Sequence, residues 1–249
     1  MSEISIRAEE LFSIAHWPIT NALLLSCVAL GILIIFAVVL RTRMKMIPGK
    51  LQSITEIVLE EILSLMDSVL GTRRLSETYL PLIATIFLFI MTSNWLGLLP
   101  GVGTIGLKHV SEGGVSSLIP LLRSPSSDLN FALALAVISV LSVNIFGTLV
   151  LGIKSHISKY LNFSSPINFF IGILEFIAEC VKIVSFSFRL FGNVFAGEVL
   201  LTIIAVLSPY LLPLPFLFLE LFVGFIQAFI FSMLTLVFIS MAVQEHEAH

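Results

Sequence analysis

The residue of this sequence that most demands a chemical explanation is Arg189, which lies in the middle of an apolar stretch. The residues around it, Ser185 to Asn193, read SFSFRLFGN, and the flanking segments are almost entirely hydrophobic. A guanidinium stays protonated at physiological pH, and a charge at the centre of a bilayer costs at least about 2.5 kcal/mol. A charge kept at that cost indicates a counter-charge or an ion path.

Five polar residues lie on one face of the helix predicted around this arginine: Glu175, Glu179, Lys182, Arg189 and Asn193. At 100° per residue their spacings return to the same side of the helix, and the other sides carry Phe, Ile, Val and Leu. Arg189 lies about 15–20 Å along the helix from the two acids, which is too far for a direct ion pair. We therefore expect its counter-charge to come from another chain.

Two further carboxylates and an amide lie off this face. Glu198 follows Arg189 by nine residues, so it points to the opposite side of the helix. Glu220 and Gln227 are seven residues apart and share one face of the last apolar segment. In lipid, such polar faces are buried against each other or against another protein.

These polar residues also admit structural interpretations. Glu175, Glu179 and Lys182 form either an ion cluster near the cytoplasmic membrane surface or the lining of an aqueous entry path. Asn193 and Gln227 either belong to a functional site or form hydrogen bonds that hold helices together. The residues alone leave both alternatives open.

The composition predicts an integral membrane protein. Of 249 residues, 57% are hydrophobic and 12% are charged, and the mean hydropathy is +1.08; a soluble domain carries about 25% charged residues. No charged tail of the kind that binds nucleic acid is present. Cys27 and Cys180 lie in apolar runs and the histidines share no ligand spacing, so we expect no metal, no cofactor and no catalytic residues.

The predicted fold is all-α, a single membrane domain over 1–249 with about five membrane-embedded helices. Its expected parts are an external N-terminus (1–20), spans over 21–40, 80–100 and 129–153, an interfacial amphipathic helix over 51–70, and long helices over 167–207 and 216–243. A packed cytoplasmic helix is the alternative for 51–70. Asn94, near the end of the second span, is interpreted as a cap or a packing contact. The segment 101–128 has no clear periodicity and is expected to be a loop.

The helix over 167–207 is too long for an upright span. Its 41 residues correspond to about 60 Å, twice the hydrocarbon thickness. It is therefore kinked or steeply tilted. Pro209, Pro213 and Pro215 break the chain before the last helix.

Basic residues favour one orientation. With five crossings and the N-terminus outside, eight Lys and Arg residues lie in inside segments and three in outside segments, which agrees with the positive-inside rule. The C-terminus is then cytoplasmic. No internal repeat is evident, so the inverted-repeat architecture of many secondary transporters has no support.

Three segments of the sequence match motifs of one family. The run from Ser185 to Glu198, SFSFRLFGNVFAGE, closely resembles the arginine-helix signature of subunit a of F-type ATP synthases. The runs Phe225 to Phe231 and Asn94 to Pro100 are similar to its last-helix and second-span motifs. The resemblance covers the chain from Asn21 to His249, in order.

The resemblance implies a non-catalytic, proton-conducting stator subunit whose last two helices form a long, strongly tilted hairpin. Its implied partners are a ring of c subunits, the b-subunit peripheral stalk, other ATP synthase subunits and membrane lipid. Arg189 would face the ring carboxylates, with Asn193 and Gln227 beside it.

The same resemblance places the remaining polar residues in two half-channels. Glu198 and Glu220 would line the external one, and Glu175, with Glu179 and Lys182 on the same face, the cytoplasmic one. Family members often carry a Glu/His pair where this chain has two glutamates. A bacterial plasma membrane is the expected location, with an organelle inner membrane as the second choice.

Two rival functions remain possible from the sequence. A self-contained transporter or channel would use Arg189 to bind a substrate anion, and a structural scaffold would tolerate its replacement by leucine. The sequence does not fix whether the coupling ion is H⁺ or Na⁺, nor the number of c subunits.

Overall fold

The computed structural model describes residues 9–14, 17–99, 102, 106–110, 116–153, 165–208 and 211–244. Its long helices are α1 (Asn21–Arg43), α2 (Lys50–Leu70), α3 (Arg73–Gly97), α4 (Leu129–Leu151), α6 (Pro166–Leu207) and α7 (Pro213–Gln244). Among the described helices, α1, α3, α4, α6 and α7 are long and apolar enough to cross a membrane. The prediction of an all-helical membrane protein is therefore confirmed.

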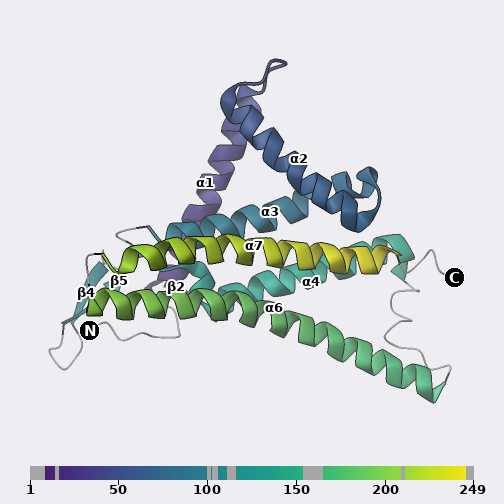
Figure 1. Cartoon of the computed structure of the whole chain (residues 1–249). Helices are drawn as coiled ribbons and strands as arrows, with labels where there is room; N and C mark the ends of the chain where they lie inside the picture. Colours follow the sequence, from purple (N-terminus) through teal and green to yellow (C-terminus); the bar gives the residue numbers. More distant parts are fainter. Residues whose placement is uncertain are drawn as a thin grey trace.

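Four helices form the body of the molecule, and two form an arm. In Figure 1, α3, α4, α6 and α7 run across the view, while α1 rises steeply from them and α2 slants from the top of α1 down to the start of α3. The helices α6 and α7 form an antiparallel hairpin, and α6 bends away from α7 toward its N-terminal end. The hairpin thus lies at a steep angle to α1, as expected if α1 spans the bilayer more nearly upright.

The body is held by one apolar core where its four helices meet. The core residues are Ile86, Phe87 and Ile90 of α3, Ala132, Leu135 and Ala136 of α4, Phe186 and Leu190 of α6, and Ala228 and Phe231 of α7. The small alanines of α4 and α7 let the helices approach closely, which is the usual way to pack helices in lipid. The ring centroids of Phe186 and Phe231 lie 4.9 Å apart and join the two hairpin helices.

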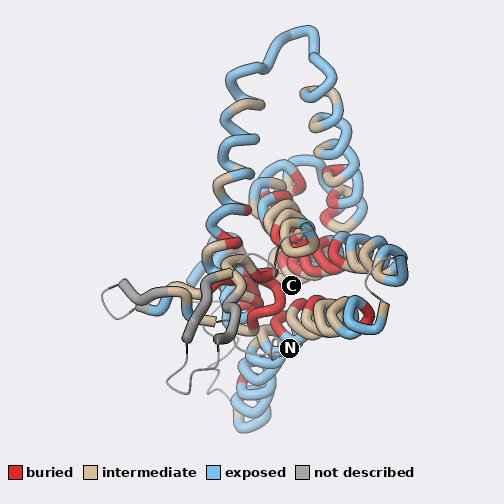
Figure 2. Tube along the Cα trace, turned by 90° about the vertical axis from the view of Figure 1, so that its left-hand side faces the viewer, coloured by how far each residue is buried: buried red, intermediate tan, exposed pale blue. Residues whose placement is uncertain are grey.

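A second apolar cluster ties the arm to the body. Met66 and Leu70 at the end of α2 pack against Tyr79 and Ile83 of α3, and α4 and α7 complete the cluster. At the base of α1, five residues are also buried: Asn21, Ala22, Leu25, Ser26 and Ala29. Most of the rest of the arm is exposed, as the pale blue tube in Figure 2 shows. The exposed side chains of α1 are mostly apolar, because lipid is expected to surround this helix, whereas α2 also exposes Glu56, Glu60 and Glu61.

Two helix starts differ from the prediction. The helix α3 begins at Arg73, well before residue 80, because its polar first turns extend past the apolar run. The helix α7 begins at Pro213 rather than at 216. Proline is well tolerated in a first turn, where the missing N–H has no helical partner, so only part of the Pro-rich segment breaks the chain.

Two short β-hairpins lie outside the helices in the described part of the chain. The strand β1 (Glu10–Ile14) pairs with β2 (Trp17–Thr20), and β4 (Gly106–Val110) pairs with β5 (Ser116–Pro120) within the segment expected to be a loop. These strands are too short to give a periodic signal, and their pairing satisfies backbone groups. A short 3₁₀ helix, η1 (Pro125–Ser127), precedes α4.

Some residues of the orientation argument cannot be placed. Arg7, Lys154 and Lys159 lie outside the described residues, as do residues 154–164 and 245–249. The N-terminal segment is nevertheless tied to the body at Asn21, whose backbone N–H donates to the Glu9 carbonyl at 3.1 Å. The Asn21 side chain donates to the Pro120 carbonyl at 3.2 Å, which joins the two hairpin regions.

Candidate ion-conducting site

Arg189 lies at the edge of the face that α6 presents to the core. Phe186, Leu190 and Val194 repeat every four residues and are buried, whereas Arg189 is only partly buried. Its guanidinium lies 3.4 Å from the Ser185 hydroxyl, one turn back on the same helix. Within the described part of the chain, no carboxylate forms an ion pair with it.

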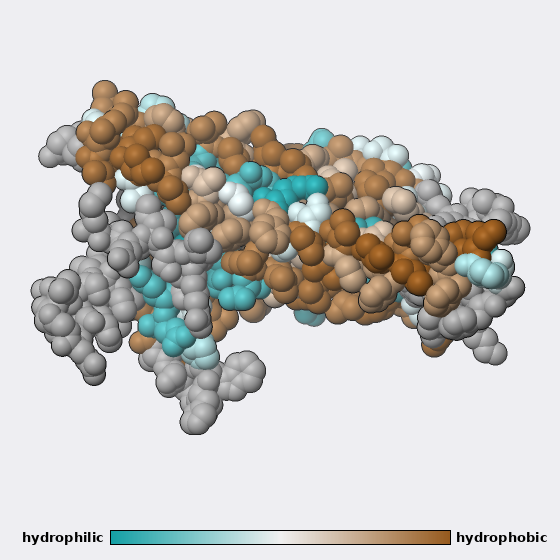
Figure 3. Space-filling view, turned by 90° about the horizontal axis from the view of Figure 1, so that it is seen from below, coloured by the Kyte–Doolittle hydropathy of each residue, from teal (hydrophilic) through white to brown (hydrophobic). Residues whose placement is uncertain are grey.

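The surface beneath the hairpin combines hydrophobic and polar groups. Figure 3, the view from below, shows hydrophilic atoms gathered near the middle of a face that is otherwise largely hydrophobic. A polar patch in such a surface is costly against lipid. It is therefore expected to meet another protein rather than the bilayer.

An amide pair bridges the hairpin one turn beyond Arg189. The Asn193 side chain on α6 donates to Oε1 of Gln227 on α7 at 2.8 Å. Gln227 is 2% exposed, and its own NH₂ group has no protein partner among the described residues. The pair joins the two helices and leaves one buried donor, the Gln227 amide, in this part of the hairpin.

A cavity of about 540 Å³ opens beyond this pair, at the end of the body where the β-hairpins lie. We call it the carboxylate pocket; its polar lining is Asn94, Arg123, Ser124, Glu198, Thr202 and Glu220. Glu198 comes from α6 and Glu220 from α7, so the two acids predicted on different helices meet here. The half-turn offset between Arg189 and Glu198 directs Glu198 into the pocket.

Gly197 makes room for Glu220. A Cβ atom placed on Gly197 would collide with both carboxylate oxygens and the carboxylate carbon of Glu220. The Glu220 carboxylate is thus seated against the backbone of α6, next to Glu198. The sequence shows Gly197 only as a possible point of flexibility, because this contact comes from a distant helix.

Arg123 is a pocket residue that the sequence reasoning did not select. It lies between β5 and η1, its side chain is 8% exposed, and its Nε lies 3.4 Å from Glu198 Oε1. The same Nε–H donates to the Ser127 hydroxyl at 3.2 Å. In the sequence, Arg123 is only one of the three basic residues of the outer segments.

Comparison with known proteins shows the family to which this chain belongs. The sequence model described as ATP synthase A chain matches residues 23–240. The chain belongs to the ATP synthase A chain family. It is therefore a non-catalytic membrane subunit of an ATP synthase, and other subunits of that complex are its partners.

Relatives align over nearly the whole chain. It is 35% identical to ATP synthase subunit a of Mycobacterium leprae over 239 residues, which cover 92% of this chain and 89% of that protein. It is 33% identical to subunit a of Moorella thermoacetica over 242 residues, covering 97% and 99%. For subunit a of Campylobacter concisus the identity is 33% over 226 residues, covering 89% of each.

The second-span motif of this chain fastens α3 to α7. The Asn94 side chain donates to the Gly224 carbonyl at 3.1 Å, and the Trp95 indole donates to the Leu221 carbonyl at 3.2 Å. Asn94 is therefore a packing contact between helices rather than a cap. Its other side-chain atom, Oδ1, is buried without a protein partner among the described residues.

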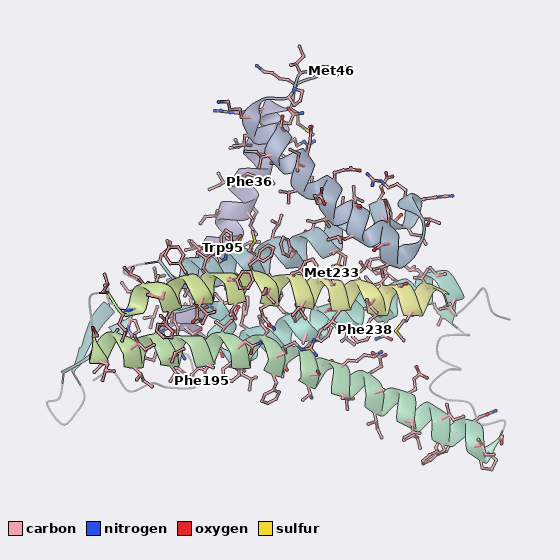
Figure 4. All side chains as sticks on the ribbon, in the orientation of Figure 1. Phe36, Met46, Trp95, Phe195, Met233 and Phe238 are labelled. Atoms are coloured by element: carbon pink, nitrogen blue, oxygen red, sulfur yellow. The ribbon has the colours of Figure 1, made fainter. Side chains whose placement is uncertain are left out.

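The charged groups on the N-terminal half of α6 form a separate cluster. Lys182 pairs with Glu179 at 2.6 Å, and the Asn144 amide of α4 donates to Glu179 at 3.3 Å. The ammonium also lies 4.7 Å from the ring centroid of Phe238, which Figure 4 shows on the side of α7 facing α6. Glu175 lies one turn further from Arg189 and is partly buried. Arg189 thus stands between two polar regions of α6.

Proposed function

We propose that this chain is the stator subunit that conducts protons past the c-ring of an F-type ATP synthase. The observation that carries the proposal is Arg189, a partly exposed guanidinium in an apolar helix without a carboxylate partner in the described part of its own chain. A ring carboxylate from another subunit supplies the missing charge. Membership of the ATP synthase A chain family supports this assignment.

Arg189 acts on each ring carboxylate as rotation brings it past. A carboxylate facing lipid stays protonated, because a bare charge there is too costly. Beside Arg189 the positive charge favours the ionised form, so the proton leaves. Arg189 itself cannot relay a proton at physiological pH, and it therefore separates the two sides of the path.

The carboxylate pocket is the proposed external half-channel. It holds Glu198 and Glu220, and beyond it the Asn193–Gln227 pair leads toward Arg189. Buried polar atoms without a protein partner in the described residues occur along this route, on Asn94, Glu198 and Gln227. Buried polar groups of this kind usually bind water, and a chain of water carries protons.

The cluster of Glu175, Glu179 and Lys182 is the proposed start of the cytoplasmic half-channel. Lys182 lies seven residues before Arg189 and Glu198 nine residues after it, so the half-channels are offset by roughly 25 Å along α6. A proton can pass from one to the other only on a rotating carboxylate. The membrane potential drives this with about 2.3 kcal/mol per charge per 100 mV.

The remaining assignments follow from the same proposal. A b-subunit stalk holds the chain still against the ring, the N-terminus (1–20) lies outside, the helix over 51–70 lies at the inner surface, and the C-terminus is cytoplasmic. The membrane is the plasma membrane of a bacterium, a source in keeping with the relatives described above.

Proton-driven ATP synthesis by the purified complex in vesicles tests the proposal. Arg189→Ala should abolish synthesis while the c-ring and the soluble head still co-purify with the chain. Arg43→Ala, at the exposed end of α1, is the matched control and should leave synthesis unchanged. Synthesis near the wild-type rate in the Arg189→Ala complex would refute the mechanism.

A further inference from the structure

Arg123 is a buried charged residue that takes no part in the steps of the proposed mechanism. It is 7% exposed and belongs to the short segment between β5 and η1, outside every candidate span. Ser127 fixes its Nε at 3.2 Å, and the same atom lies 3.4 Å from Glu198. Arginine is rarely buried unless it is paired, so its partners indicate its role.

Two carboxylates lie near this guanidinium, and a third lies beside one of them. Glu198 from α6 pairs with it directly. Glu220 from α7 is seated against Gly197, beside Glu198. Glu9, just before β1, lies near enough for Arg123 to act on it: burial raises the pKa of the Glu9 carboxyl, and the positive charge of Arg123 partly opposes that rise.

The other elements around the pocket add no further positive charge in the described part of the chain. The helix α3 contributes Asn94. Asp128, the next carboxylate after Arg123, accepts a hydrogen bond from the Asn130 N–H at 3.0 Å as the cap of α4. Arg123 is therefore the local cation, and its pairing with Glu198 makes the two facing acids unequal.

We propose that Arg123 is a positioning residue that holds Glu198 as a fixed, charged partner, so that Glu220 becomes the group that carries the entering proton. Two neighbouring carboxylates do not both ionise freely. The one that faces the guanidinium keeps its charge, and the other takes up the proton. Glu220 shares a face of α7 with Gln227. Gln227 lies two turns further along α7, on the side toward Arg189.

This inference rests on the proposed function, because it concerns the order of events in the external half-channel. Without Arg123, the pocket carboxylates would hold protons more tightly. The half-channel would then stay loaded at higher external pH. Without Glu198, Glu220 would lose its negatively charged neighbour and would therefore release its proton at lower pH. The two removals thus predict shifts of opposite sign.

The experiment measures proton-driven ATP synthesis by the whole complex in vesicles, at fixed membrane potential and fixed pH on the ATP side. The external pH is varied, and the pH at which the rate falls to half is recorded. Arg123→Gln should move this point upward by about 1–3 units, the usual effect of removing an opposite charge. Glu198→Gln should move it downward, and Arg123→Lys should stay near wild type.

A structural role for Arg123 predicts a different result. It would lower the yield of assembled Arg123→Gln complex and leave the pH profile of the remainder unchanged, and that outcome overturns the inference. If Arg123→Gln does not assemble, Glu198→Gln alone decides, because an unshifted or upward-shifted profile contradicts the proposal. The double variant Arg123→Gln/Glu198→Gln should return toward the wild-type profile.

Failure of this inference can be told apart from failure of the proposed function. If Arg189→Ala abolishes synthesis and the Arg123 and Glu198 profiles do not move, only the role of Arg123 is wrong. If Arg189→Ala retains synthesis, the coupling mechanism is wrong whatever the pH profiles show.

Discussion

Gly197 shows how one missing side chain defines the carboxylate pocket. The Glu220 carboxylate occupies the space that a Cβ at residue 197 would need. At Gly31, in α1, an added Cβ meets no atom within 4 Å. Substitution by alanine is therefore expected to disturb the pocket at Gly197 and to have no effect at Gly31.

Gly197→Ala should slow proton-driven ATP synthesis by displacing the Glu220 carboxylate. Overpacking costs about 1–3 kcal/mol, so a loss of roughly fivefold to 150-fold is expected if this cost falls on the arrangement that conducts protons, with normal assembly. Gly31→Ala should keep the wild-type rate. The double variant Gly197→Ala/Glu220→Asp should recover part of the loss, because the shorter side chain withdraws from the added methyl. A wild-type rate in Gly197→Ala would show that the seat of Glu220 does not matter.

The residues that sequence reasoning could and could not select differ in a physical way. Arg189, Asn193 and Glu198 lie in one long helix, whose period fixes their relative directions. Arg123 lies in a segment without periodicity, and its partner Glu198 is 75 residues away. No local pattern encodes such a contact, so only the folded chain reveals it.

At the scale of elements, the corner between α2 and α3 is held by charge. Gly71, with φ at 76°, ends α2 in a left-handed turn that allows α3 to begin at Arg73. Arg73 then reaches back to Glu60 at 2.8 Å and Asp67 at 3.1 Å. The Ser76 hydroxyl and the Arg73 guanidinium lower the pKa of Asp67 below its ordinary value of 3.8.

A lowered carboxylate pKa stabilises the fold only while the group is ionised. The contribution of Asp67 is therefore fully present above pH 3.8 and is lost as the pH falls through its lower value in the folded chain. Asp67→Asn should reduce the melting temperature of the detergent-purified chain slightly at pH 7, since exposed pairs contribute little. The difference from wild type should vanish in strong acid.

Melting curves of both proteins across this pH range test the prediction. Glu61→Gln, an exposed site on the same helix without an ion pair in the described chain, should show no difference at any pH. A constant difference between Asp67→Asn and wild type would mean that packing rather than charge holds the corner.

Element boundaries were predictable where the bilayer sets them. The apolar runs located α1, α4 and α6 closely, because lipid exposure demands continuous hydrophobic sequence. The start of α3 was not predictable in this way, because polar residues extend the helix beyond the apolar run. Among them, Arg73 is held by Glu60 and Asp67 of α2. The hairpins β1–β2 and β4–β5 need no continuous hydrophobic sequence, so their positions could not be predicted in this way.

At the scale of the whole molecule, the arm and the body have different surroundings. Phe36 and Met46 project from the arm in Figure 4 and are 39% and 102% exposed, whereas the hairpin of α6 and α7 carries the polar site. The long hairpin lets one helix contact both proposed half-channels. An upright span of about 20 residues is too short to contain both Glu175 and Glu198.

The isolated chain should therefore conduct no protons. Its two polar regions are separated along α6 by the length between Lys182 and Glu198, and Arg189 stands between them without a group that can relay a proton. Vesicles containing only the purified chain should show no proton uptake at an imposed potential, as followed by an internal pH-sensitive dye. A protonophore added afterwards confirms that the potential was present. Uptake by the chain alone would instead identify a self-contained channel, because a rotating carboxylate would then not be needed to carry the proton across.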